Sequence, residues 1–131
     1  MVEEVKKAAA TKAVDGNLAC ADAHDLAAEL GVAPLELGRV VNKSTELRFD
    51  RCQLGLFGYG SKAAGHSKIV LTAARVPPEI GAALEAAAVN GKVSCAVVWQ
   101  VAATFRYPRL GVANIAEAMG LKIAPCQLGC F

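Results

Sequence analysis

The sequence contains one pattern twice. Residues 16–21 (GNLACA) return as residues 91–96 (GKVSCA), and residues 52–57 (CQLGLF) return as residues 126–131 (CQLGCF). The offset is 75 residues for the first pair of segments and 74 for the second. Two copies are too few for a solenoid. The repeat therefore predicts a pseudo-twofold pair of small units, residues 1–75 and 76–131, that share a core.

Charge is distributed unevenly over these units, although the net charge of the 131 residues is only +2. Residues 1–38 carry three lysines against seven acidic residues, a net charge of −4. Residues 39–75 carry seven cationic residues against two acidic ones, a net charge of +5. The middle third of the chain is therefore the segment in which we look for contacts to an anionic partner.

Composition limits the class of protein. The apolar fraction is 54%, much of it alanine, which favours a helical globular fold and excludes a disordered chain. No apolar run approaches the roughly 20 residues of a membrane span, and the start of the chain (MVEEVKK) does not resemble a signal peptide. We therefore expect a cytoplasmic protein without a membrane partner, in which the five cysteines are thiols.

Periodicity and turn residues predict the elements of the first unit. Apolar residues at helical spacing and Gly31 as a break indicate two consecutive helices, with Pro34 in the first turn of the second one. Alternating apolar and polar residues indicate strands. The expected order is a helix over 3–14, a short strand over 18–20, helices over 21–30 and 34–43, a strand over 46–52, a glycine-rich loop over 55–65 and a strand over 68–72.

The two consecutive helices have the residue types of a helix-turn-helix. Ala27 is small enough for the helices to cross closely, Gly31 suits the left-handed conformation of a tight turn, and Leu37 and Val40 lie on the inner face. With the strands that flank it, the first unit resembles the winged helix-turn-helix family of prokaryotic DNA-binding proteins. The resemblance implies a mainly α fold with small β elements and, over the whole chain, tandem winged helix-turn-helix units.

The second unit resembles the same family less closely. Apolar residues recur at equivalent positions, but Arg106 stands where the first unit has Gly31, so we expect the tight turn to be lost. The chain also leaves no room for a second wing. We therefore predict that the second copy is a degenerate unit that packs against the first and does not itself bind DNA.

The resemblance implies a duplex DNA partner and a reading helix over 34–43. By helical phase, Arg39 is placed to contact guanine, Asn42 to contact adenine and Lys43 to contact phosphate. The expected phosphate contacts from the strands and the loop are Arg48, Arg51, Lys62 and Lys68. A monomer and a homodimer are both compatible with this arrangement.

An alternative function is a winged-helix protein-interaction module without DNA binding. Asp22 and Asp25 lie on the helix that crosses the DNA backbone in many such folds, where phosphate would repel them. In this interpretation the basic middle third docks an acidic protein partner.

The cysteines allow a second alternative, a metal or redox sensor built on the same fold. Cys20 and Cys95 are equivalent, as are Cys52 and Cys126, so each unit brings two thiols together. Cysteine is also a common core residue, and the pair Cys126 and Cys130 lacks the CxxC spacing typical of zinc sites. We expect no metal and no cofactor.

No residue pattern nominates a reaction. His24 and His66 have no catalytic partner at a suitable spacing, and residues 60–67 resemble a phosphate-binding loop with histidine in place of its lysine. The sequence therefore predicts a protein that is not an enzyme.

Overall fold

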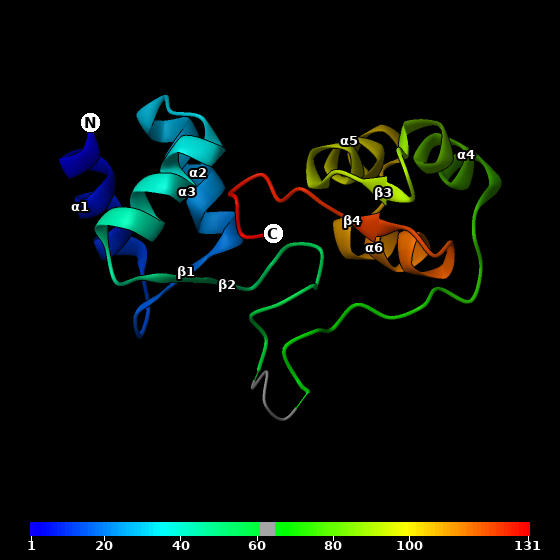
Figure 1. The fold of residues 1–131 in the computed structure, drawn as a ribbon, viewed down its shortest axis with the longest axis horizontal. Helices are drawn as coiled ribbons and strands as arrows, with labels where there is room; N and C mark the ends of the chain where they lie inside the picture. The colour runs from blue at the N-terminus through cyan, green and yellow to red at the C-terminus, as the bar shows by residue number, and fades with distance from the viewer. Residues whose placement is uncertain (61–64) are drawn as a thin grey trace.

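The computed structural model describes residues 1–60 and 65–131, and in both halves of the chain three helices and two short strands follow in one order (Figure 1). The first unit contains α1 (Val2–Lys12), β1 (Asn17–Ala19), α2 (Cys20–Leu30), α3 (Pro34–Ser44) and β2 (Arg48–Asp50). The second unit contains α4 (Pro78–Ala87), β3 (Lys92–Val93), α5 (Cys95–Phe105), α6 (Arg109–Ala118) and β4 (Lys122–Ile123). The expectation of a mainly helical fold with small β elements is confirmed.

Each unit holds its two strands together in parallel. Leu18 pairs with Phe49 in the first unit, and Val93 pairs with Ile123 in the second. Parallel strands require a crossover connection, which here consists of the two consecutive helices. The pairing therefore brings the start of α2 beside the end of β2, and the start of α5 beside the end of β4.

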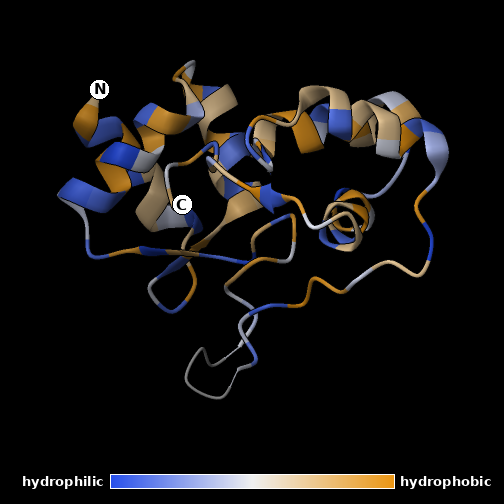
Figure 2. Ribbon diagram, turned by 45° about the vertical axis from the view of Figure 1, so that its right-hand side comes forward, coloured by the Kyte–Doolittle hydropathy of each residue, from blue (hydrophilic) through white to orange (hydrophobic). Residues whose placement is uncertain are grey.

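The turn between α2 and α3 has the predicted conformation. Gly31 adopts φ = 67°, and the amide of Val32 donates to the carbonyl of Ala27 at 2.9 Å. Both features reverse the chain direction within a few residues. Figure 2 shows helices that carry both apolar and polar residues, as expected when one face lies in a core.

The expectation that the second unit loses this turn is wrong. Arg106 adopts the same left-handed conformation, with φ = 54°, and the amide of Tyr107 donates to the carbonyl of Ala102 at 2.9 Å. The backbone of α5 and α6 thus repeats that of α2 and α3. An arginine is tolerated there because its side chain is exposed, so that only the backbone strain remains.

The expected strand over 68–72 is also wrong, and within the described residues no wing is formed by this segment. The amides of Ile69 and Val70 both donate to the carbonyl of Gly55, at 2.8 and 3.0 Å. The next residues bind the second unit, where the amide of Leu71 donates to Asn114 Oδ1 at 2.8 Å and the amide of Ala73 donates to the Asn114 carbonyl at 3.1 Å. Contacts with α6 replaced the strand pairing that we predicted for the extended run over residues 68–72.

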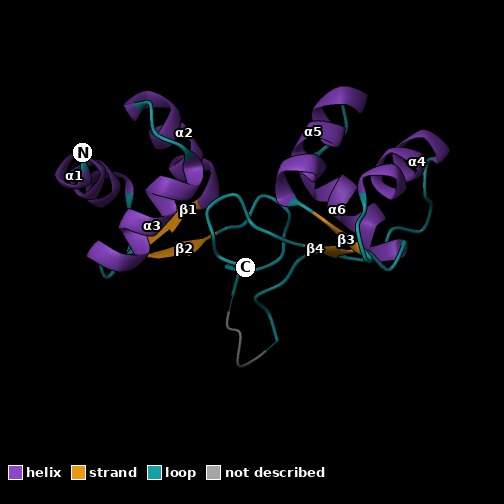
Figure 3. Ribbon diagram, turned by 45° about the horizontal axis from the view of Figure 1, so that its top comes forward, coloured by secondary structure: helices purple, strands orange, loops and turns teal. Residues whose placement is uncertain are grey.

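The repeated CQLG segments join the two units by crossing between them (Figure 3). Leu54 belongs to the first unit but is fully buried in the core of the second, among residues such as Leu84 and Val112. Leu128 belongs to the second unit but is buried in the core of the first, among residues such as Leu18 and Leu37. Among the described residues the two segments cross without pairing as strands.

Small residues make room for this exchange. A Cβ atom at Gly38 on α3 would overlap the carbonyl oxygen of Leu128. One at Gly129 would lie 3.1 Å from Leu35, and one at Gly55 would lie 2.6 Å from Leu110, the residue equivalent to Leu35. The same contact between a glycine and a leucine therefore occurs on both sides of the pseudo-twofold axis.

None of the helices among the described residues has both the length and the apolar character needed to cross a lipid bilayer.

Truncation of either exchanged leucine should destabilise both units. We expect Leu54→Ala and Leu128→Ala each to lower the free energy of unfolding by about 2–5 kcal/mol, because each leaves a cavity in a core. Urea denaturation followed by circular dichroism measures this change. Leu71→Ala is the matched control, since Leu71 is 70% exposed and its truncation should have little effect. Equal effects of all three variants would contradict the burial of Leu54 and Leu128 in each other's units.

We expect substitutions at the two turns to change the free energy of unfolding in opposite directions. Gly31→Ala should lower the free energy of unfolding by about 1 kcal/mol through left-handed strain alone, because nothing lies within 4 Å of the added Cβ atom. Arg106→Gly relieves the same strain and should give a smaller change in the opposite direction. Thermal denaturation of both variants tests this, and a loss of stability in Arg106→Gly would show that the arginine side chain contributes more than its backbone strain costs.

Candidate nucleic-acid interface and inter-unit groove

The outer face of α3 presents the residues expected to contact bases. Arg39, Asn42 and Lys43 are all exposed, whereas Leu37 and Val41 on the opposite face are fully buried. Arg39 Nη1 lies 3.6 Å from Glu36 Oε2, and the two side chains are 60% and 51% exposed. An ion pair this exposed contributes little stability, so Arg39 can leave it at a small cost.

The expected phosphate contacts only partly come together. Arg48, Arg51 and Lys68 are exposed, and Lys62 lies outside the described residues. Arg48 and Lys68, together with Asn42 from α3, line one groove between the two units, whereas Arg51 is absent from its lining. The structure thus groups three of the seven predicted residues at this groove.

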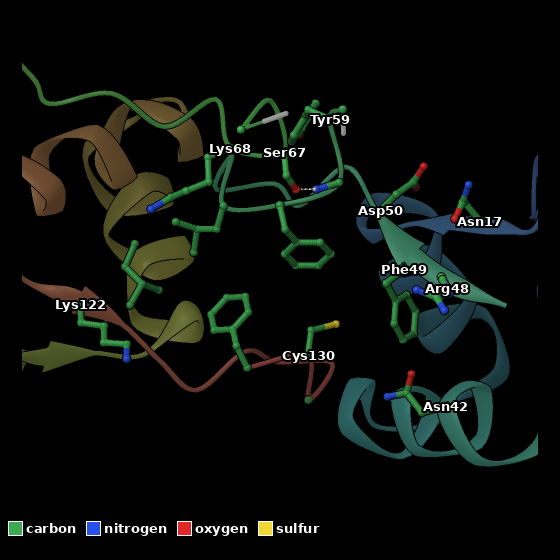
Figure 4. A pocket seen from close by; sticks show the side chains of 18 of the residues that line it. Asn17, Asn42, Arg48, Phe49, Asp50, Tyr59, Ser67, Lys68, Lys122 and Cys130 are labelled. Carbon is green, nitrogen blue, oxygen red and sulfur yellow. Dashed lines mark hydrogen bonds between the residues drawn. The ribbon is translucent and has the colours of Figure 1, made fainter. Parts of the chain in front are cut away.

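This groove has a volume of about 1260 Å³. Figure 4 shows Asn42 and Arg48 on one side and Lys68 and Lys122 on the other. Aromatic rings of Phe49, Phe57, Tyr59 and Phe131 contribute to its lining. The groove therefore combines apolar surface with cationic side chains from both units.

The face of α6 that corresponds to the outer face of α3 is in contact with the segment that connects the two units. Asn114 stands at the position equivalent to Arg39, and both its side chain and its carbonyl accept hydrogen bonds from residues 71–73. Glu117 and Ala118 stand where α3 has Asn42 and Lys43. At these three positions α6 therefore has no cation, and residues 71–73 lie on one of them.

A stack of three side chains lies between the two units. His24 and Trp99 occupy equivalent positions on α2 and α5, and their ring centroids are 4.3 Å apart. The guanidinium of Arg109 lies 3.6 Å from the Trp99 ring centroid, and its Nη1 donates to Gln53 Oε1 at 3.4 Å. Trp99 packs against both cores.

The stack keeps His24 neutral. Burial, and then the positive charge of Arg109, lowers the pKa of His24 below its ordinary value of 6.5. Within the described residues, neither His24 Nε2 nor Trp99 Nε1 has a hydrogen-bond partner. A proton on His24 would therefore lie beside a cation, and the negative charge of Asp25 offsets this effect only in part.

Three of the four equivalent cysteines are protonated core residues. Burial raises the pKa of Cys20 to about 12, and it also raises the pKa of Cys52 and of Cys95. Among the described residues, no three His, Cys, Asp or Glu side chains are gathered closely enough to hold a metal ion. Cys126 differs from the other three, because its pKa is lowered to about 6 by a hydrogen bond from Cys130.

Sequence reasoning missed two residues that shape these surfaces. Arg109 has no cationic counterpart in the first unit, where Pro34 occupies the equivalent position, and Asn114 was not distinguished from other polar helix residues. Comparison of the two copies position by position could have drawn attention to Arg109. Nothing in the sequence indicated that Asn114 binds a connecting segment.

No protein-family profile, curated protein or solved structure matches this chain.

The neutral His24 predicts a pH-dependent stability. The unfolded chain takes up a proton here at pH values near 6.5, whereas the folded protein does so only at lower pH. The free energy of unfolding should therefore fall as the pH decreases through 6.5. Thermal midpoints measured from about pH 8 to about pH 5 check this dependence.

His24→Phe keeps a ring against Trp99 but cannot titrate, so it should reduce the pH dependence. His66→Gln changes an exposed histidine and should preserve it. An unchanged pH profile in His24→Phe would contradict the assignment to His24.

Proposed function

We propose that this protein is a DNA-binding regulator in which α2 and α3 of the first unit form a helix-turn-helix and α3 enters the major groove. The observation that carries the proposal is the combination of a tight turn between α2 and α3 with an exposed outer face on α3 that carries Arg39, Asn42 and Lys43. Arginine pairs well with guanine and asparagine with adenine. The basic strand and loop residues would add phosphate contacts.

The second unit supports the first in this proposal. Its two helices have the same turn, but residues 71–73 lie on α6 at the position equivalent to Arg39. Its core encloses Leu54 of the first unit and so holds the segment that follows β2. The duplication accordingly supplies one reading helix and one scaffold.

Acidic residues restrict the direction from which DNA can approach. Asp25 and Glu29 are exposed on α2 and would repel phosphates that pass over this helix. Three cations, Arg48, Lys68 and Lys122, line the inter-unit groove with Asn42. They outnumber its two acidic residues, Asp50 and Glu117, so a net positive surface continues from α3 toward the second unit. We expect the DNA backbone to follow that side of α3.

Binding to duplex DNA across a salt series tests the proposal. The logarithm of the binding constant should fall linearly with the logarithm of the salt concentration, because phosphate contacts release counterions. Replacement of both Arg39 and Lys43 by alanine should weaken binding and reduce the slope by about 1, the share of the single phosphate contact assigned to Lys43, at an unchanged thermal midpoint. Fluorescence anisotropy with a labelled duplex measures both quantities.

The matched control replaces Lys7 and Lys12, two exposed lysines on α1, by alanine and changes the net charge equally. This control should bind DNA almost as well as the unaltered chain. Equal losses in the two double variants would indicate attraction by net charge alone. Absence of binding at low salt would exclude the DNA function.

The inter-unit groove favours one second candidate, the binding of an acidic protein segment. Phe49, Phe57 and Phe131 offer apolar surface, and Arg48 and Lys122 offer positive charge on opposite sides of it. In this function the outer face of α3 would contact no DNA and would not need to be exposed. A chain that binds no duplex but binds an acidic amphipathic peptide, and loses that binding in Arg48→Ala, would support this candidate.

A further inference from the structure

Five thiols gather where the two units meet. Cys20 and Cys95 begin α2 and α5, and Cys52 and Cys126 follow the strands that pair beside them. The thiols lie close enough for the charge of one to act on the pKa of another, as Cys52, Cys95 and Cys126 do on Cys20. Burial keeps Cys20, Cys52 and Cys95 protonated, which makes them poor nucleophiles.

The fifth thiol breaks the symmetry of the repeat. Cys130 follows Cys126 by four residues, whereas the equivalent position after Cys52 is Leu56. Cys130 is exposed and lines the inter-unit groove, and Cys126 is half-buried (Figure 4). Only the C-terminal copy of the segment therefore contains two thiols with a path to solvent.

A short loop holds these two thiols in contact. The amide of Cys126 donates to the carbonyl of Phe131 at 2.7 Å, and the amide of Gly129 donates to the carbonyl of Cys126 at 3.1 Å. These two bonds fold residues 126–131 back on themselves, which places the Cys130 thiol beside the Cys126 sulfur. Leu128, which is buried in the core of the first unit, anchors the middle of the loop.

The same contacts make Cys126 a thiolate near neutral pH. The hydrogen bond from Cys130 and backbone amides lower the pKa of Cys126 to about 6, and the pKa of Cys130 is raised because it shares its proton with that sulfur. The amide of Leu128 also donates to Cys126 Sγ at 3.3 Å. A thiolate beside a second thiol is the arrangement required for disulfide exchange.

We propose that Cys126 and Cys130 form a thiol–disulfide exchange site whose substrate is a low-molecular-weight disulfide. The Cys126 thiolate attacks one sulfur of that disulfide, the small S–S bond breaks, and the released thiolate takes a proton from water. Cys130 then loses its proton, and its thiolate attacks Cys126 Sγ in the mixed disulfide. The second small thiolate leaves and accepts that proton. Two protein thiols are oxidised to one disulfide, and the small disulfide is reduced to two thiols.

This site is independent of the proposed DNA function. The thiols are already in contact in the reduced loop, so the disulfide can form while Leu128 stays in the first core. We therefore expect the oxidised chain to remain folded and to unfold at a slightly higher temperature, because the new bond restrains the unfolded loop.

The test uses the full reduced chain and the disulfide of glutathione as the probe. After incubation with buffers of varied reduced and oxidised glutathione, the remaining thiols are alkylated and located by peptide mass spectrometry. Cys126 and Cys130 should lose alkylation together and form one intramolecular disulfide, whereas Cys20, Cys52 and Cys95 should stay reduced. In the absence of glutathione, the alkylation rate of Cys126 should be half-maximal near pH 6.

Variants separate the two steps. Cys130→Ser should stop at the mixed disulfide, with one glutathione bound to Cys126, and it should fold normally because Cys130 is exposed. Cys52→Ala removes the thiol at the position equivalent to Cys126 and should leave the exchange unchanged; its circular dichroism spectrum confirms its fold.

Three results would overturn the proposal. The first is full alkylation of both cysteines in the most oxidising buffer. The second is a disulfide that forms only between two chains, as seen on a non-reducing gel. The third is a stoichiometric metal ion in the purified protein that blocks alkylation until a chelator removes it.

Discussion

The burial of Leu54 and Leu128 in each other's units is the interaction on which the rest of the structure depends. Neither half of the chain is long enough to bury a large core by itself. Each unit encloses a leucine of the other, so the two cores are completed together. The exchange also positions the groove, the stack of His24, Trp99 and Arg109, and the five thiols, because all of them lie where the two CQLG segments cross.

The connection between the units introduces the asymmetry that matters for function. One segment links β2 to α4. Residues 71–73 of this connection bind Asn114 on α6, whereas Arg39 on α3 remains largely exposed. Two similar folds thereby acquire different surfaces, because the amides of Leu71 and Ala73 find their acceptors on α6.

Duplication explains the four equivalent cysteines better than a shared ligand does. Cys20, Cys52 and Cys95 are buried thiols, and within the described residues no set of three side chains could hold a metal ion. The position of Cys130 is the exception, because its counterpart is Leu56 and its sulfur contacts that of Cys126. A single difference between the copies thus changes a packing residue into half of a reactive pair.

The sequence by itself determined the repeat, the helices and the turn at Gly31, because these depend on local periodicity and on backbone preferences that neighbouring residues express. It also placed Arg39, Asn42 and Lys43 on an exposed helical face. Only the tertiary structure decided that Arg106 repeats the Gly31 turn, that residues 68–72 bind Asn114 instead of forming a wing, and that Leu54 and Leu128 exchange places. These outcomes depend on contacts between distant segments. The packing energy of those contacts exceeds the local preference of Arg106 for negative φ, and it exceeds the preference of residues 68–72 for strand pairing.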